Sequence, residues 1–192
     1  MFKNFRWDNE SRIIKEEGSM LLLEAHPGKD YFVNPEDGTK TLNAAYYYKM
    51  VTGDFVIRAK VTHEFISTYD ACALLAMQDD VTWGKLCFEK SDFGTNAVVS
   101  VVTNGVSDDA NGVNIDGKTV WLQMARKGNI FGLHYSLDGK QFYMARLFKL
   151  ECDSAIKVGI VAQSPTGDGG EFLFESISLE EDVLIENIRA GK

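Results

Sequence analysis

The sequence has no long apolar run, few cysteines and few prolines. No stretch approaches the roughly 18 apolar residues of a membrane-spanning helix, and the opening MFKNFRWDNESRII lacks the apolar core of a signal peptide. The three cysteines, Cys72, Cys87 and Cys152, are odd in number and show no C-x-x-C spacing. This pattern favours a reducing compartment over a disulfide framework or a zinc site, so we expect a cytoplasmic protein.

Positive charge is also in short supply. The chain has 20 Lys and Arg against 28 Asp and Glu, a formal net charge of −8. Such a field repels nucleic acid and anionic membrane surfaces, so neither is an expected partner, whereas neutral or cationic partners are favoured. The 192 residues can bury one sizeable core, and the three prolines and 17 dispersed glycines mark no interior boundary. We predict a single domain spanning residues 1–192.

Helical periodicity is almost absent, and period-two alternation dominates instead. In DFVIRAKVT (54–62) every second residue is apolar, which predicts a strand with one dry face. ACALLAM (71–77) is apolar on both parities, so a central strand covered on two sides is expected, although periodicity alone also allows a short buried helix. The same patterns predict further strands at 19–25, 45–50, 83–89, 96–103, 119–126, 129–136, 142–148, 156–163 and 171–179.

The connectors between these runs favour tight antiparallel turns. Lys127-Gly128 and Asp138-Gly139 separate strand-like segments, and such dipeptides suit hairpins, so residues 119–148 are predicted to form a meander. About a dozen strands without helices indicate an all-β sandwich of two packed antiparallel sheets. The tail VLIENIRAGK (183–192) is expected to be a last short strand or an edge cover.

Five motifs follow one another in a recognisable order: GDFVIRAKV, YDACALLAMQDDVTWGKLCFEKSDFG, VVTNGVSDDANG, VWLQMARKGNIFGLHYSLDGKQFY and VGIVAQSPTGDGGEFLFESISL. This order resembles the regulation-of-enolase domain family, a branch of the concanavalin A-like lectin/glucanase superfamily, over nearly the whole chain. The resemblance implies a concanavalin A-like jelly-roll β-sandwich with one concave sheet, on which relatives in the superfamily often hold sugars. It implies no reaction, because fold alone does not carry function.

WGKLCFE (83–89) is the strongest candidate for a ligand-binding strand. Alternation places Trp83, Lys85, Cys87 and Glu89 on one face. Trp83 is expected to stack on a sugar ring while Lys85 and Glu89 hydrogen-bond to its hydroxyls. The plain alternative is that Lys85 and Glu89 are surface charges and Trp83 shields an edge.

Other polar residues are expected to line the rim of the same surface: Tyr69, Asp70, Asn104, Asp108 and His134. Within residues 104–116, five oxygen-bearing side chains could suit calcium: Asp108, Asp109, Asn111, Asn114 and Asp116. Their spacing does not match a known calcium loop, and Asn and Asp also build turns. A turn that touches a ligand is therefore favoured over a metal site, and no metal is predicted.

No catalytic residue and no cofactor is predicted. There is no G-x-S-x-G motif, the histidines His26, His63 and His134 are scattered, and the glycine-rich SPTGDGG precedes no helix pattern. Glycosidases of this superfamily often carry E-x-D-x-x-E, which is absent here, so Glu89 would need a carboxyl from another strand, with Asp70 the best candidate.

The main prediction is therefore non-catalytic binding of a carbohydrate or sugar-like metabolite on the concave sheet. A second hypothesis is a regulatory protein-interaction module acting on a metabolic enzyme, and a third is a glycoside hydrolase. The second predicts an exposed aromatic patch at NAAYYYKM (43–50), since three consecutive tyrosines cannot all point inward from one strand. The plain alternative is a strand with ordinary surface tyrosines.

Overall fold

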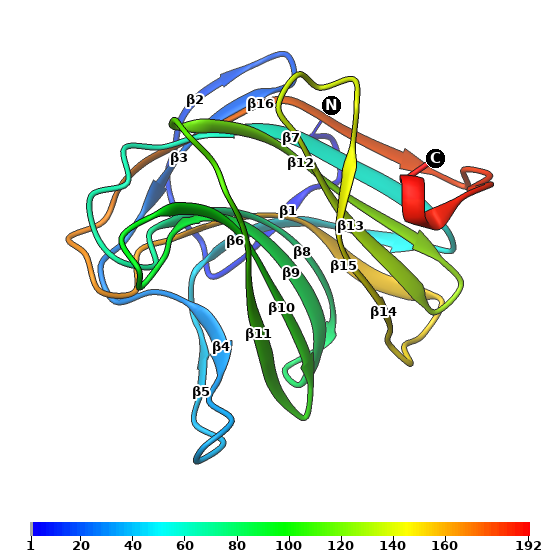
Figure 1. The fold of residues 1–192 in the computed structure, drawn as a ribbon, viewed down its shortest axis with the longest axis horizontal. Coiled ribbons are helices and arrows are strands. Elements are labelled where there is room, and N and C mark those ends of the chain that lie inside the picture. Colours follow the sequence, from blue (N-terminus) through cyan, green and yellow to red (C-terminus); the bar gives the residue numbers. More distant parts are fainter. Residues whose placement is uncertain (1) are drawn as a thin grey trace.

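The structure is a computed structural model that describes residues 2–192. Two seven-stranded antiparallel sheets pack face to face, and a two-stranded hairpin lies against one of them (Figure 1). The predicted all-β jelly-roll sandwich is confirmed. All the strand segments expected from alternation are strands, and the single helical element in residues 2–192 is one 3-10 turn.

The first sheet carries the central apolar strand. Its strands, in spatial order, are β1 (Arg6–Asp8), β6 (Ala45–Thr52), β15 (Ala155–Gln163), β8 (Ala71–Asp79), β9 (Thr82–Lys90), β10 (Asn96–Asn104) and β11 (Val106–Asn114). In Figure 1, β8 to β11 bend around the small hairpin formed by β4 (Tyr31–Val33) and β5 (Lys40–Leu42). The outer face of the first sheet, which is turned away from the second sheet, is therefore concave.

The second sheet contains the predicted meander. Its strands, in spatial order, are β14 (Tyr143–Lys149), β13 (Ile130–Ser136), β12 (Thr119–Lys127), β7 (Phe55–Thr62), β16 (Gly170–Glu181), β3 (Met20–Ala25) and β2 (Ile13–Glu17). The turns that join β12, β13 and β14 use Gly128 and Gly139, with φ angles of 58° and 73°. Only glycine adopts such angles at little cost, so these two residues fix the hairpins where the sequence predicted them.

The main core lies between the two sheets, and period two decides which side chains enter it. On β7 the apolar residues Phe55, Ile57, Ala59 and Val61 are fully buried in this core. On β8 both parities are buried, because one face meets the second sheet and the other meets the β4–β5 hairpin. The central strand at 71–77 is thus confirmed.

A second apolar cluster lies on the outer face of the first sheet. The β4–β5 hairpin packs Tyr31 and Val33 against side chains of β6, β8, β9 and β10. The rings of Tyr31 and Trp83 meet edge to face with centroids 6.5 Å apart. This cluster covers one part of the concave face and leaves the neighbouring part open to a cavity.

The prediction that most of residues 104–116 form a turn is wrong. Residues on both sides of Gly105 belong to one long hairpin, β10 and β11, and Gly105 itself makes the turn at a φ angle of 88°. The Asp- and Asn-rich segment is an edge strand, and exposed edge strands are often rich in polar residues, which discourage pairing with another chain.

The predicted aromatic surface at 43–50 is also wrong. Tyr46, Tyr47 and Tyr48 alternate in direction as expected, yet they are only 0%, 9% and 8% exposed. Tyr46 and Tyr48 lie in the cluster under the β4–β5 hairpin, while Tyr47 packs against the aromatic rings of the amino-terminal segment. Strand β6 is covered on both faces, so alternation does not bring any of the three rings to the surface.

The carboxy-terminal tail forms no strand. Ile185 is buried against Val56 and Ala125 on the outer face of the second sheet, and the 3-10 turn η1 (Ile188–Ala190) follows it. The tail contacts β12, β13 and β14, so it covers a face of the sheet rather than its edge. None of the helices in residues 2–192 combines the length and apolar character needed to cross a bilayer.

Candidate functional site

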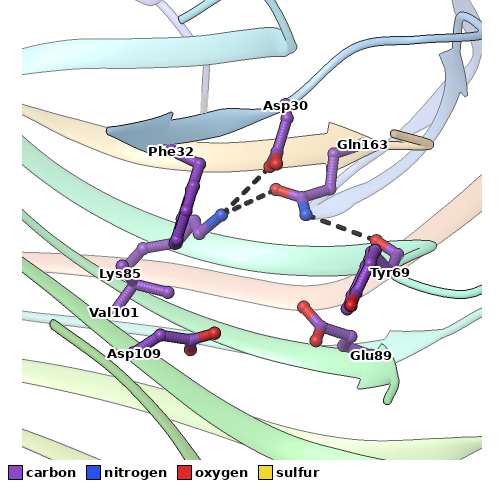
Figure 2. Close-up of a pocket in the computed structure, with 8 residues that line it drawn as sticks. All are labelled: Asp30, Phe32, Tyr69, Lys85, Glu89, Val101, Asp109 and Gln163. Atoms are coloured by element: carbon purple, nitrogen blue, oxygen red, sulfur yellow. Dashed lines mark hydrogen bonds and ion pairs between the residues drawn. The ribbon is translucent and has the colours of Figure 1, made fainter. Parts of the chain in front are cut away.

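A cavity of about 200 Å³ opens on the concave outer face of the first sheet, next to the β4–β5 hairpin. Figure 2 shows the side chains that line it, which are Asp30, Phe32, Tyr69, Lys85, Glu89, Val101, Asp109 and Gln163. Strands β9, β10, β11 and β15 form its floor. Strand β4 and the segments that carry Asp30 and Tyr69 form its walls.

The strand register explains why these side chains meet. Lys85 pairs with Val101, and Val101 pairs with Asp109, so the three stand in one row across β9, β10 and β11. In a second row, Ala71 of β8 lies between Glu89 and Gln163. Because alanine is small, the space above it stays empty, and the cavity lies between longer polar side chains.

Lys85 is the buried cation of the cavity. Its ammonium donates to the Tyr31 carbonyl at 2.8 Å, to Gln163 Oε1 at 2.9 Å and to Asp30 Oδ1 at 3.4 Å. Burial lowers the pKa of Lys85, but nearby acidic groups, Asp30 first, raise it by more, and the ammonium stays charged. Its three donors are used within the protein, so Lys85 holds the walls of the cavity together and has no hydrogen left to offer a ligand.

Glu89 differs from Lys85 because its carboxyl has no partner. The residue is 6% exposed, and no hydrogen bond or ion pair to its carboxyl occurs within residues 2–192. No fully enclosed side-chain oxygen or nitrogen of the described chain lacks a partner, so the oxygens of Glu89 are reached from the cavity. Burial, with smaller contributions from Asp109 and Asp30, raises the pKa of Glu89 to about 8 against the opposing effect of Lys85.

Asp109 brings a further carboxyl to the cavity from the edge strand. It is exposed, and Figure 2 shows it on the same side of the cavity as Glu89. Partial burial raises the pKa of Asp109, Lys85 lowers it, and Asp30 and Asp92 raise it again. The carboxyls of this cavity therefore share a single buried ammonium.

Tyr69 enters the wall on a strained backbone. Its φ angle is 69°, and Phe65 in the same connection between β7 and β8 has a φ angle of 56°. Left-handed conformations cost bulky residues about 1–3 kcal/mol each and tend to mark functional segments. The Tyr69 amide donates to the Lys90 carbonyl at 2.7 Å, and its own carbonyl accepts from Gln163 Nε2 at 3.3 Å. These bonds hold the half-exposed ring at the mouth of the cavity.

Of the residues singled out in the sequence, Tyr69, Lys85 and Glu89 lie together around this cavity. Trp83 shares their face, but its side chain is fully buried under Tyr31, and its indole nitrogen donates to the Asp80 carbonyl at 3.3 Å. The expectation that Trp83 stacks on a sugar is therefore wrong, because neither face of its ring is free.

The other predicted rim residues lie elsewhere. Asp70 is buried behind the cavity wall, where it accepts from Ser164 Oγ at 2.7 Å and from the Ser67 amide at 2.9 Å. It cannot pair with Glu89 across a ligand, as the glycosidase hypothesis required. Asp108 points to the opposite side of β11 from Asp109 and forms an ion pair with Arg146 of the second sheet at 3.0 Å.

Asn104 and His134 are likewise separate from the cavity. Asn104 is exposed at the end of β10 and is not among the lining residues. His134 belongs to β13 in the second sheet, where Ile188 O lies 3.0 Å from its Nε2 and Gln123 lies 3.3 Å from its Nδ1. It is a buried structural histidine, and burial lowers its pKa.

Four lining residues were not singled out from the sequence, Asp30, Phe32, Val101 and Gln163, and Asp109 was named only as a possible calcium ligand. Asp109 was assigned to a turn, although correct pairing of 106–114 with β10 would have placed it beside Val101, in the same row as Lys85. Asp30 and Phe32 reach the cavity only because the β4–β5 hairpin folds over the sheet, and no local pattern signals that contact. No set of three or more His, Cys, Asp or Glu side chains arranged to hold a metal ion occurs in residues 2–192.

The fold is an all-β jelly-roll sandwich of two antiparallel sheets, with a cavity on the concave face of one of them. The chain belongs to the family described as "Protein of unknown function (DUF1349)", whose profile matches residues 7–182. A search of curated proteins gives no match.

Solved structures extend the likeness in fold. A functionally unknown protein from Saccharomyces cerevisiae is similar with a TM-score of 0.87 and 23% identity, covering 95% of this chain and 98% of that chain. A xylan β-1,4-xylosidase from Bacillus halodurans is similar with a TM-score of 0.68 and 12% identity, but the match covers 84% of this chain and only 33% of the xylosidase. Lectin I-B4 from Griffonia simplicifolia gives a TM-score of 0.59 and 11% identity over 94% of both chains.

Proposed function

We propose that the cavity binds a carbohydrate or sugar-like metabolite of about one ring in size without transforming it. One observation carries the proposal: polar side chains that accept or donate, Glu89, Asp109 and Gln163, line the same cavity as the rings of Phe32 and Tyr69. Sugar hydroxyls both donate and accept, while the carbon face of a sugar ring packs on aromatic side chains.

The size of the cavity supports a small ligand. At about 200 Å³ it is below the range of about 300–1,000 Å³ that is usual for sites of drug-sized molecules. A single sugar ring suits this space better than an oligosaccharide. Two of the proteins with a similar fold bear names that refer to sugars, a lectin and a xylosidase, which agrees with the class of ligand.

A cavity-filling substitution tests the proposal. Val101 is buried on the cavity floor, so Val101→Phe places a ring in the space of the ligand. Val106→Phe is the matched control, because Val106 is 43% exposed on β11 and does not line the cavity. We expect a sugar from a monosaccharide panel to raise the Tm of the wild type and of Val106→Phe but not of Val101→Phe. No shift at millimolar concentrations, or a shift that survives Val101→Phe, would contradict the proposal.

One observation favours glycoside hydrolysis as a second candidate. With its pKa raised to about 8, Glu89 is protonated at neutral pH, as a general acid must be, and Asp109 brings a second carboxyl to the same cavity. This candidate predicts that nitrophenyl glycosides release nitrophenol and that Glu89→Gln abolishes the release. Binding without release across a broad panel would leave the non-catalytic proposal alone.

The narrower assignment to the regulation-of-enolase branch, with a metabolic enzyme as partner, also stays a proposal. The tyrosines at 43–50 offer no surface for such a partner, because all three are buried. Ile66 and Phe93 are 73% and 77% exposed on neighbouring loops, which Lys90 joins by donating to the Phe65 carbonyl at 3.1 Å. We therefore propose this loop pair for contact with an enzyme. A pull-down from cell extract in which Phe93→Ser retains every partner of the wild type would contradict it.

A further inference from the structure

The cavity holds more carboxyl groups than cations. Asp30, Glu89 and Asp109 line it, and Lys85 is the one basic side chain among its lining residues. Lys85 forms an ion pair with Asp30, 3.4 Å from the ammonium, and gives its other donors to uncharged oxygens. Glu89 and Asp109 are left without a cation in contact.

The surroundings of Glu89 suggest that the excess of carboxyls over cations serves to bind a ligand. Glu89 as a residue is only 6% exposed, and the carboxyl of so buried a residue normally has hydrogen-bond donors from the protein, as that of Asp70 does one strand away. Glu89 has none within residues 2–192, and Figure 2 shows its carboxyl facing the cavity rather than the sheet. Because the oxygens of Glu89 are open to the cavity and receive no donor from the protein, a donor is expected to come from the molecule that fills the cavity.

We infer that the ligand carries a protonated amine, as in an amino monosaccharide, whose ammonium lies between the carboxyls of Glu89 and Asp109. An ammonium has three donors and one positive charge, so it matches two carboxyls better than a hydroxyl does. The rings of Phe32 and Tyr69 suit the same ligand, because aromatic faces attract both sugar carbons and cations. This inference rests on the proposed function and narrows its ligand class.

The electrostatics of the cavity argue in the same direction against anionic ligands. The charged or titratable groups that face Glu89 are Lys85 on its own strand, Asp109 on β11, Asp30 before β4, Asp92 in the turn after β9 and Tyr69 in the wall. Three of these five are carboxyls, whereas Tyr69 stays uncharged because burial and the nearby carboxyls raise its pKa above the ordinary value of 10.0. A phosphorylated sugar would add negative charge beside them, so it is expected to bind more weakly than the sugar without phosphate.

Calorimetric titration at about pH 6.5, where amino sugars are cationic, tests the inference. The probes are glucosamine, galactosamine and mannosamine, each compared with its neutral parent sugar and its N-acetyl derivative. Cyclohexylamine serves as a ring amine without hydroxyls. We expect one amino sugar to bind at least tenfold more tightly than its two neutral counterparts and than cyclohexylamine.

A proton balance gives a second readout. In the free protein the Glu89 carboxyl holds a proton at this pH, and the incoming ammonium lowers its pKa, so the proton passes to the buffer. The binding enthalpy of the amino sugar should therefore differ between phosphate and Tris buffers, while that of the neutral sugar should not. Glu89→Gln keeps the shape of the side chain and removes the proton, so the buffer dependence and the tenfold preference should both disappear. Glu186→Gln, an exposed position far along the tail, should change neither.

The possible outcomes separate the two claims. Equal affinity for amino and neutral sugars would overturn the inference and leave the proposed function intact. Tight binding of cyclohexylamine with no gain from hydroxyls would overturn the sugar-binding proposal while supporting the amine. Absence of binding by every probe would overturn both. An amino-sugar preference that persists unchanged in Glu89→Gln would overturn the assigned contact.

Discussion

The outer faces of the two sheets both contain buried polar side chains, but the two faces differ in whether these side chains have hydrogen-bond partners within the chain. On the second sheet, Gln123 donates to the Gly191 carbonyl at 3.0 Å and accepts from Arg58, and His134 is bonded to the tail. Each polar end there has a partner within the chain. On the first sheet, Lys85 is equally well bonded, whereas the Glu89 carboxyl beside it has no partner. The comparison separates polar groups that hold the fold together from one whose carboxyl is open to a cavity.

Removing the buried cation should have the largest effect. Lys85→Met leaves Asp30, the Tyr31 carbonyl and Gln163 Oε1 without their donor, and breaking a buried ion pair costs about 3–5 kcal/mol. Urea unfolding measures the loss. Lys118→Met is the control, since its ion pair with Glu64 is exposed and should be worth less than about 1 kcal/mol. Equal effects of the two substitutions would show that Lys85 does not hold the cavity walls.

The unpartnered carboxyl should make stability depend on pH. The pKa of Glu89 is about 8 in the folded protein against an ordinary value of 4.5, so the folded state keeps a proton that the unfolded chain releases. The free energy of unfolding therefore falls as pH rises through this window. Relative to the wild type, Glu89→Gln should gain on the order of 3 kcal/mol between about pH 5 and pH 8.5. Parallel pH profiles of the two proteins in urea unfolding would contradict this expectation.

The cover of the second sheet can be tested at Gly191. A Cβ there would overlap the Gln123 amide nitrogen, and the φ angle of 67° disfavours any side chain. Gly191→Ala should cost about 1–3 kcal/mol and speed hydrogen exchange of the tail. Gly38→Ala isolates the backbone part, because Gly38 has a φ angle of 75° and nothing within 4 Å of its Cβ position. If Gly191→Ala lowered the free energy of unfolding no more than Gly38→Ala does, the tail would be able to move away from Gln123 without a loss of stability.

The smallest effect is expected at Asp108, next to Asp109 on the edge strand. In its ion pair with Arg146 the Asp108 side chain is 72% accessible, so Asp108→Asn should change the free energy of unfolding by less than about 1 kcal/mol. It should leave ligand affinity unchanged, whereas Asp109→Asn should weaken binding. Loss of binding in Asp108→Asn, measured by the same calorimetry, would show that the ligand contacts the face of β11 that carries Asp108 rather than the face that carries Asp109.

The fold could largely be predicted from the sequence, because the alternation of apolar and polar residues indicates which faces of a strand are buried. The segment 54–62 showed one dry face and 71–77 showed two, and the structure has both. The same alternation placed Lys85 and Glu89 on a common face. It could not tell how that face is covered, so Trp83 was predicted to be free although the β4–β5 hairpin buries it.

The remainder of the site depends on contacts between distant segments. The place of Asp109 in the cavity could not be predicted, because Asp, Asn and Gly favour turns locally. Pairing with β10 nevertheless makes 106–114 a strand. Gln163 ends an apolar strand, and only its bonds to Lys85 and Tyr69 give it a place in the site. Local propensity contains no information about such partners.

The bonds made by Gln163 also bear on biosynthesis. This residue follows Asp30, Tyr69 and Glu89 in the sequence, and its amide joins Lys85 to the backbone of Tyr69 at the cavity wall. Translation proceeds from the amino end, so a nascent chain that already contains Asp30, Tyr69 and Glu89 still lacks the hydrogen bonds of the Gln163 side chain. A chain truncated before β15 would therefore contain the carboxyls of Asp30, Glu89 and Asp109 but lack the amide that joins Lys85 to Tyr69.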